Sequence, residues 1–312
     1  MKTINNASFL KRFYIYQRER FPILTHGLLI AIFTFSAVSF SRICRGVEGF
    51  VPMSTYLIGT FATITLFFLV RVFDEFKDKE EDAKYRKYLP VPRGLISLTE
   101  LKKVAIVVII LQLAMIAFFQ PRMIVLYLVV LGYLSLMGVE FFVPKWLKQR
   151  QILYITSHML IIPLVDIYAS GLDWLLNDQK APFGLAFFFG VSYMNGIVLE
   201  FGRKIRAPEK EEHGVISYTG LYGTKRGTIY WILILFTTLL LSFAASIYAG
   251  YGNTAIIVLS ILFVLCALPG FLFLTKPSEK LSRMIEKSSG LWTMGMYLSL
   301  GGLPMLAHLI NA

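Results

Sequence analysis

Long apolar stretches recur from one end of the sequence to the other, and they limit the folds that the chain can adopt. Each is close to the roughly 20 residues that an α-helix needs to cross the hydrocarbon core of a bilayer. Hydrophobic residues make up 56% of the 312 residues and charged residues only 16%, which is too apolar for a soluble domain of this length. The sequence therefore predicts an all-α, polytopic membrane protein.

Nine of these stretches are long enough to be transmembrane helices, and we expect them to pack into one bundle. Because they occupy most of the chain, residues 1–312 are expected to form a single domain without a separate soluble module. The predicted spans lie at about 22–41, 53–72, 103–119, 123–142, 152–170, 183–201, 229–249, 254–274 and 290–309.

The basic residues are divided unequally between the segments that connect the spans. With the N-terminus in the cytoplasm and the C-terminus outside, 27 of the 31 lysine and arginine residues fall on the cytoplasmic side. This is the distribution that the positive-inside rule describes. The net charge of +12 is then explained by an integral position in the lipid bilayer, and no basic and aromatic patch outside the loops indicates nucleic acid.

The segment before the first span is polar and basic up to Arg20. It predicts a short helix that lies on an anionic membrane surface. No cleavable signal peptide is expected, because the first apolar run is followed by arginines rather than by a small-residue cleavage site.

A short sequence pattern occurs twice, after the second and after the sixth predicted span. Residues 94–99 read Gly-Leu-Ile-Ser-Leu-Thr, and residues 214–219 read Gly-Val-Ile-Ser-Tyr-Thr. Four spans separate the two copies. The spacing predicts an internal duplication, in which spans 1–4 and spans 5–8 form two related four-helix halves and span 9 is appended.

A run of acidic residues follows the second predicted span. Asp74, Asp78 and Asp82 are spaced four residues apart and Glu75 precedes Asp78 by three, so a helix would place all four on one face. Such like charges repel one another, and a cation is expected to neutralise them. Interleaved lysines would do so on a solvated helix end; in a binding site, Mg²⁺ would do so together with substrate phosphates.

The loop after the sixth span carries the second group of candidate residues. Glu200 closes a span that also contains Asn195, and ionisable residues at that depth normally face a bundle interior. An ion pair between Glu200 and Lys204, four residues on, is the simpler interpretation. The acids at 209–212 are more typical of an exposed loop. His158 and Asp166 share one face of the fifth span, either as structural polar groups or as substrate contacts.

These features resemble the UbiA superfamily of intramembrane prenyltransferases, whose first motif is Asn-Asp-x-x-Asp-x-x-x-Asp. Asp74, Glu75, Asp78 and Asp82 fit that spacing, and residues 90–97 are similar to the family segment that leads into the third span. The second family motif, Asp-x-x-x-Asp, is filled here by Glu200 and Lys204, so one carboxylate is missing. The resemblance covers the whole chain in topology but only the two loops in motifs.

The resemblance implies an enzyme that ionises an allylic prenyl diphosphate with Mg²⁺ and transfers the prenyl group to an aromatic or lipid-like acceptor. The implied metal ligands are Asp74, Glu75, Asp78, Asp82 and Glu200. The implied diphosphate-binding residues are Arg86, Lys87, Arg93, Arg203, Lys204 and Asn195. The implied catalytic residues are Asp78, Asp82 and Glu200.

Two other functions are compatible with parts of this pattern. A terpene cyclase of the same family would act on a prenyl diphosphate without an acceptor. A non-enzymatic transporter would place polar pairs such as His158 and Asp166 near the bilayer midplane, but the charge clusters of this chain lie at one membrane face instead.

Overall fold

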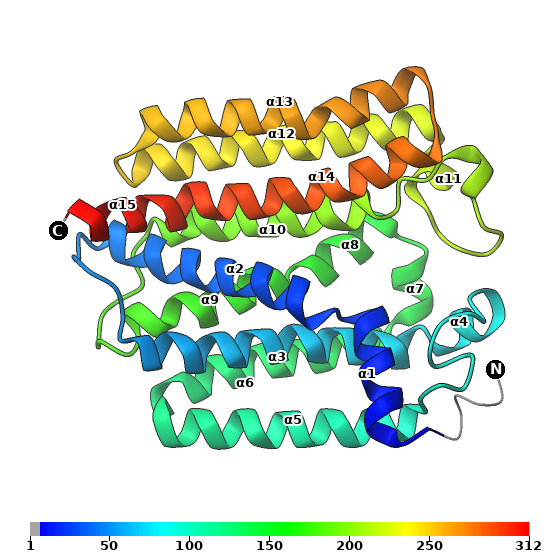
Figure 1. The fold of residues 1–312 in the computed structure, drawn as a ribbon, viewed down its shortest axis with the longest axis horizontal. Coiled ribbons are helices and arrows are strands. Elements are labelled where there is room, and N and C mark those ends of the chain that lie inside the picture. Colours follow the sequence, from blue (N-terminus) through cyan, green and yellow to red (C-terminus); the bar gives the residue numbers. More distant parts are fainter. Residues whose placement is uncertain (1–6, 312) are drawn as a thin grey trace. The chain divides into compact units, whose positions relative to one another are not determined.

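The computed structural model describes residues 7–311, and all of the regular structure within them is helical (Figure 1). Nine helical segments in this part of the chain are long and apolar enough to cross a membrane, which confirms the predicted number. The fifth consists of two helices with a break at Leu160, and the ninth contains a π-helical turn. The prediction of an all-α polytopic protein is therefore confirmed.

Three helices begin at least five residues before the predicted apolar stretches: the seventh begins at Thr224, and the third and ninth begin at capped positions. The third starts at Leu98, where Ser97 and Glu100 form a capping box, and the ninth starts at Glu279, after the Ser278 N-cap. Apolar stretches mark only the part of a helix that lies in hydrocarbon. Capped polar turns extend the third and ninth helices beyond it.

The chain forms two compact units, and the first comprises Met1–Ala31 and Pro52–Tyr154. In it, α3 packs against both α5 and α6. Buried Gln112 joins the three, because its amide nitrogen donates to the Ala62 carbonyl (3.0 Å) and its amide oxygen accepts from the Tyr127 hydroxyl (2.8 Å). The helical elements of this unit are α1 (Phe9–Arg20), the start of α2 (Ile23–Cys44), α3 (Met53–Lys77), α4 (Lys79–Tyr85), α5 (Leu98–Phe119), η1 (Pro121–Met123), α6 (Ile124–Gly138), η2 (Glu140–Phe142), α7 (Pro144–Lys148) and the start of α8 (Gln151–Met159).

The second unit comprises Ile32–Val51 and Ile155–Ala312. Here α10 packs against α9, α12 and α14, and α13 packs against α12 and α14. The remaining part of α2 belongs to this unit, where Phe33 lies 5.2 Å from Tyr297 and Phe40 lies 5.2 Å from Phe188, measured between ring centroids. The further helical elements are α9 (Ile161–Trp174), α10 (Leu185–Gly202), η3 (Pro208–Lys210), α11 (Tyr218–Tyr222), α12 (Thr224–Tyr248), α13 (Gly252–Thr275), α14 (Glu279–Tyr297), the π-helical turn η4 (Leu298–Gly302) and α15 (Leu303–Asn311).

The boundary at Tyr154 agrees with the predicted division between spans 4 and 5, but the first span does not belong wholly to the first half. Its second part joins the second unit, because the aromatic residues of that part pack there. The two copies of the repeated pattern adopt the same local conformation. Gly94 and Gly214 have φ values of 78° and 76°, and Ser97 and Ser217 cap the helices that follow. This similarity supports the predicted duplication.

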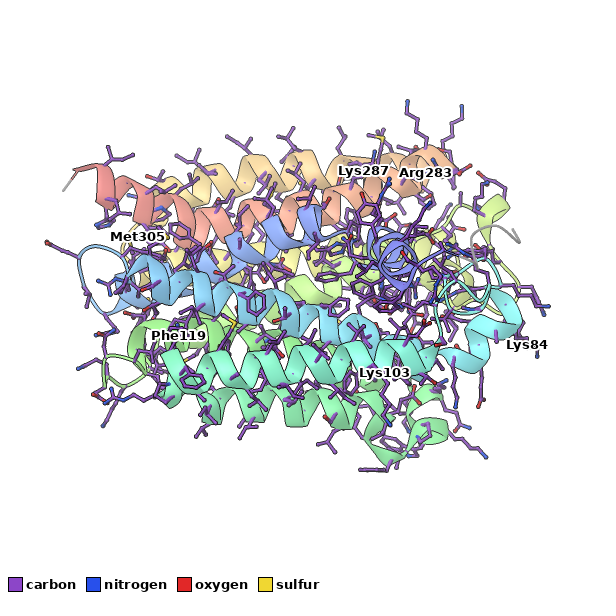
Figure 2. All side chains as sticks on the ribbon, turned by 60° about the horizontal axis from the view of Figure 1, so that its bottom comes forward. Lys84, Lys103, Phe119, Arg283, Lys287 and Met305 are labelled. Carbon is purple, nitrogen blue, oxygen red and sulfur yellow. The ribbon has the colours of Figure 1, made fainter. Side chains whose placement is uncertain are left out.

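Charged and apolar side chains separate along individual helices. Figure 2 shows Lys103 and Phe119 at opposite ends of α5 in the first unit. In the second unit, Arg283 and Lys287 lie at one end of the ninth span and Met305 at the other (Figure 2). On each of these two spans, the labelled cationic side chains lie at one end and the labelled apolar side chain at the other.

Candidate active site

The acidic motif lies where α3 passes into α4. The helix is interrupted at Asp78, which has φ and ψ values of −92° and 6°. Backbone hydrogen bonds from Asp78 to Asp74 and from Asp82 to Asp78, both 2.9 Å, nevertheless continue the helical register across the break. The predicted four-residue spacing of the aspartates is therefore retained, with a change of direction at the middle one.

Three of the four acids are already paired with cations of the protein. Glu75 is 2% exposed and accepts from Arg20 Nε at 2.6 Å and from Arg71 Nη2 at 3.0 Å. Asp74 lies 3.0 Å from Lys77 Nζ, and Asp82 lies 3.2 Å from Arg86 Nη1. Glu75 is thus the charge partner of two arginines rather than a free ligand.

Asp78 differs from its neighbours, because no ion pair or side-chain hydrogen bond holds its carboxylate within residues 7–311. Burial raises the pKa of Asp78, with Lys77 opposing the shift and Asp74 and Asp82 adding to it. Burial also raises the pKa of Asp82, against the effect of Arg86. A cation at this position would relieve the repulsion between these carboxylates.

The N-terminal helix is attached to this motif and to the loop after it. Arg12 forms a two-pronged ion pair with Glu100, at 2.6 and 3.2 Å, and donates to the Leu95 carbonyl at 3.0 Å. Glu19 pairs with Arg93 at 2.7 Å. The sequence predicted that this segment lies on the membrane surface; in the structure, side chains of α1 also hold the loop between α4 and α5.

The predicted diphosphate ligands of the first loop have different surroundings. Arg86 is paired with Asp82 and Arg93 with Glu19, whereas Lys87 is exposed. Both arginines would have to exchange or share a carboxylate in order to bind phosphate. Lys87 is available without such a change.

Glu140 is a residue of this region that the sequence analysis missed. It is 4% exposed. Lys148 Nζ lies 3.9 Å from one carboxylate oxygen of Glu140 and 2.7 Å from a carboxylate oxygen of Glu81. Glu140, Phe141 and Phe142 have φ values of 48°, 53° and 61°. Non-glycine residues in the left-handed region are strained, and strain of this kind gathers at functional sites. No glycine marks this turn, so the sequence gives no signal of it.

The second loop follows α10 in the other unit. Glu200 is buried and accepts from Lys204 Nζ at 2.6 Å and from Arg203 Nε at 2.8 Å. The ion pair with Lys204 is the simpler interpretation given above, and it is confirmed. Both oxygens of Glu200 are engaged by cations, so this carboxylate holds Arg203 and Lys204 at the end of α10.

Two of the acids at 209–212, Glu211 and Glu212, form hydrogen bonds or an ion pair within the loop. Glu211 accepts from the Ser217 hydroxyl at 2.5 Å and from the Thr219 hydroxyl at 2.7 Å. Glu212 pairs with Arg206 at 2.7 Å. These contacts fold the loop back onto the start of α11.

Asn195 has different neighbours from Arg203 and Lys204, which are both paired with Glu200. It is 1% exposed, and its side chain lies near the hydroxyl of Tyr297. Its contact with diphosphate stays a prediction.

The predicted metal ligands do not form a ready cluster. Within the part of the chain that the structure describes, no three histidine, cysteine, aspartate or glutamate side chains are grouped closely enough to hold a metal ion. The donor set nevertheless suits Mg²⁺, since it consists of hard carboxylate oxygens and includes the unpaired Asp78. Substrate phosphates would have to complete such a site. The first group of predicted residues belongs to one unit, and Glu200, Arg203, Lys204 and Asn195 belong to the other.

The nine apolar helices and the charged loops define an integral, multi-pass membrane protein of the helical class. The model of the UbiA prenyltransferase family matches residues 28–287, and the chain belongs to this family. The match extends over both compact units, and it confirms the family resemblance inferred from the sequence.

Two solved structures have a similar fold. A structure of digeranylgeranylglyceryl phosphate synthase is 17% identical, with a TM-score of 0.61 over 94% of this chain and 99% of the other. A UbiA homologue from Archaeoglobus fulgidus, bound to GPP and Mg²⁺, is 14% identical, with a TM-score of 0.54 over 91% and 99%. No curated protein matches the chain. At these identities the likeness concerns the fold alone.

Proposed function

We propose that the chain is a Mg²⁺-dependent membrane prenyltransferase that acts on an allylic prenyl diphosphate and transfers the prenyl group to an aromatic or lipid-like acceptor. Membership of the UbiA family supports this class of reaction, and the homologue bound to GPP and Mg²⁺ supports the donor and the cofactor. The observation that carries the proposal is the unpaired carboxylate of Asp78 between two ion-paired aspartates.

Each group of residues has a separate part in this proposal. Asp78, with Asp74 and Asp82, would hold Mg²⁺, which when bound supplies positive charge to the leaving diphosphate. Arg86, Lys87 and Arg93 would bind phosphate oxygens from the first loop. Such fixed positive charge stabilises the diphosphate as the bond between the allylic carbon and oxygen breaks and the electron pair leaves with oxygen.

The second loop contributes positive charge rather than a second pair of acids. Glu200 keeps Arg203 and Lys204 together at the end of α10, where two neighbouring cations suit the binding of an anionic group. Direct metal binding by Glu200 and a catalytic role for it stay predictions. Its two ion pairs do not favour either role, because both carboxylate oxygens already contact cations. Glu75 likewise would orient Arg20 and Arg71 in place of binding metal.

The positive-inside distribution supports a cytoplasmic N-terminus and an external C-terminus, so the substrate would approach from the cytoplasmic face. The acceptor determines which member of the family this is. If no acceptor takes part, the same ionisation would lead to a cyclic product, and the departure of Glu200 and Lys204 from the second family motif keeps a terpene cyclase as the second candidate.

The experiment incubates purified protein in lipid nanodiscs with prenyl diphosphates of several chain lengths, with and without Mg²⁺. Diphosphate release and all extracted lipids are then measured. Release that requires Mg²⁺, with a new prenylated lipid, supports the transferase. A cyclic hydrocarbon or terpene alcohol formed from the prenyl diphosphate alone supports the cyclase. No consumption of any prenyl diphosphate contradicts both.

A further inference from the structure

A group of polar side chains lies inside the second unit, away from the charged loops. Asp166 on α9, Ser192 and Asn195 on α10, and Tyr297 at the end of α14 are at most 3% exposed. Tyr297 is within electrostatic reach of Asp166 and lies beside Ser192 and Asn195, and Ser192 lies beside Asp166. We call these four residues the interior polar cluster.

Most polar atoms of this cluster lack a partner. Both carboxyl oxygens of Asp166, the hydroxyl of Ser192 and both polar side-chain atoms of Asn195 make no hydrogen bond of normal geometry with the residues that the structure describes. Ser192 is nevertheless within interaction range of Asp166 and Tyr297, and Asn195 is within range of Tyr297. Buried polar groups in proteins are almost always hydrogen-bonded, and an unsatisfied one destabilises the fold. Hydrogen bonds of normal geometry within the fold therefore do not account for these five atoms on two packed helices.

The surroundings of the cluster suit an amphipathic molecule. The ring of Phe33 lies 5.2 Å from that of Tyr297, and the ring of Phe188 lies 5.8 Å from it, so the polar atoms border an aromatic wall. The π-helical turn η4 begins directly after Tyr297. Turns of this kind inside α-helices occur frequently at functional sites, and an ionisable residue within a membrane span normally marks such a site as well.

The chemistry of the cluster selects the ligand. Asp166 is its one ionisable acid, and no lysine or arginine is among the groups that act on it. An anionic phosphate would find no cation there to offset its charge, and one carboxyl group is too few to hold a metal ion. Asparagine, serine and tyrosine side chains both donate and accept hydrogen bonds. An uncharged hydroxyl group, which also does both, matches this set.

We propose that the interior polar cluster is a binding site for the hydroxyl group of a hydrophobic, lipid-like ligand. Identification of this ligand with the prenyl acceptor rests on the proposed function; the binding site does not. The cluster then specifies an acceptor that carries an uncharged hydroxyl group at membrane depth, as opposed to one recognised through a carboxylate or phosphate.

The test measures saturable binding of 1-dodecanol, dodecane and dodecyl phosphate to the full chain in nanodiscs. Infrared difference spectra of the side-chain carboxyl bands, assigned with the Asp166→Asn variant, report on the cluster directly. We expect 1-dodecanol to bind saturably and to shift the Asp166 band, and dodecane to do neither. Dodecyl phosphate, which the charged loops can bind, is expected to leave the Asp166 band unchanged. Equal effects of the alcohol and the alkane, or a shift of the Asp166 band by the phosphate, would overturn the proposal.

Two serine variants form a matched control. Ser192→Ala removes an unsatisfied hydroxyl of the cluster, whereas Ser242→Ala removes a buried hydroxyl that already donates to the Thr238 carbonyl at 2.7 Å on α12. We expect affinity for 1-dodecanol to fall about tenfold in Ser192→Ala and in Asn195→Val, and to be unchanged in Ser242→Ala. Wild-type affinity in both cluster variants would contradict the proposal.

The thermal stability of the ligand-free protein separates a binding role from a structural one. Because Asn195 is unsatisfied, Asn195→Val is expected to keep or raise the unfolding temperature while it weakens alcohol binding. Loss of stability without loss of binding would assign Asn195 to the fold and overturn the proposal. Diphosphate release is measured on the same samples, so failure of the proposed function is seen separately from failure of this site.

Discussion

Arg20 and Glu75 form an ion pair of 2.6 Å that joins α1 to the end of α3, and the Glu75 side chain is 1% exposed. Arg71 contributes a second cation to the same carboxylate oxygen at 3.0 Å. The three charges lie beside the aspartates of the motif. The N-terminal helix is therefore part of the environment of the candidate active site.

Replacing Arg20 by leucine is expected to lower the free energy of unfolding by roughly 2 kcal/mol, because Glu75 stays buried with one cation fewer. The loss is smaller than the 3–5 kcal/mol typical of a broken buried pair, since Arg71 remains. Thermal and chemical unfolding measure it. Arg18→Leu, which alters an exposed arginine on the same helix, serves as the control and is expected to change stability little. Equal losses in both variants would contradict the role of the pair.

The pH dependence of stability tests Glu140. Burial raises the pKa of its carboxyl group, with Lys148 and Lys77 opposing the shift. The folded protein then binds a proton at Glu140 more tightly than the unfolded chain does. Its contribution to stability is greatest at acidic pH and is lost as pH rises from the unfolded pKa of about 4.3 through the raised folded value.

Glu140→Gln is therefore expected to stabilise the metal-free protein near neutral pH and to flatten its stability profile between acidic and neutral pH. Unfolding temperatures measured across this range, beside the exposed Glu80→Gln control, provide the comparison. A profile of Glu140→Gln that parallels the wild type would show that the carboxyl group is not perturbed.

Glu200 distinguishes a role in holding cations from a role in binding metal. Glu200→Gln leaves Arg203 and Lys204 without their shared carboxylate, and we expect a loss of about 1–3 kcal/mol in stability. The Mg²⁺ concentration that gives half-maximal diphosphate release is expected to change little. A large increase in that concentration, with stability unchanged, would instead identify Glu200 as a metal ligand.

Gly301 tests the packing of the second unit. A Cβ atom at this position would lie 2.2 Å from the carbonyl oxygen of Ser36, which is backbone and has little freedom to move. Gly301→Ala is expected to destabilise the protein by about 2 kcal/mol or more. A Cβ atom at Gly190, also within a helix, would meet open space, so Gly190→Ala is expected to be neutral or slightly stabilising. Similar unfolding temperatures for the two variants would contradict this packing.

Features with a local cause could be predicted from the sequence. The nine spans follow from length and hydropathy, and the spacing of Asp74, Asp78 and Asp82 follows from helical geometry, which the backbone hydrogen bonds preserve. The ion pair of Glu200 with Lys204 is also local, since four residues separate the partners. The capped helix starts at Ser97 and Ser217 explain why the repeated pattern was recognisable.

Features that depend on tertiary contacts could not be predicted. Arg20 and Glu75 are 55 residues apart, and nothing in either local sequence marks the other as its partner. The left-handed turn at Glu140 contains no glycine, which is the usual sign of such a conformation. The family resemblance grouped Asn195 with the diphosphate-binding cations of the second loop, because it lies on the span that Glu200 closes. That Asn195 also lies beside Tyr297 of another helix could not be predicted from the local sequence.

Diphosphate release by the Asp78→Asn variant tests the central claim most directly. The assay uses purified protein in nanodiscs with a prenyl diphosphate and saturating Mg²⁺, and it compares wild type, Asp78→Asn and the exposed-site control Glu80→Gln. Since Asp78 has no ion-pair partner to lose, Asp78→Asn is expected to keep its unfolding temperature. We predict that its Mg²⁺-dependent release falls at least about a hundredfold while the control keeps wild-type release. Near-wild-type release by a folded Asp78→Asn variant would contradict the account.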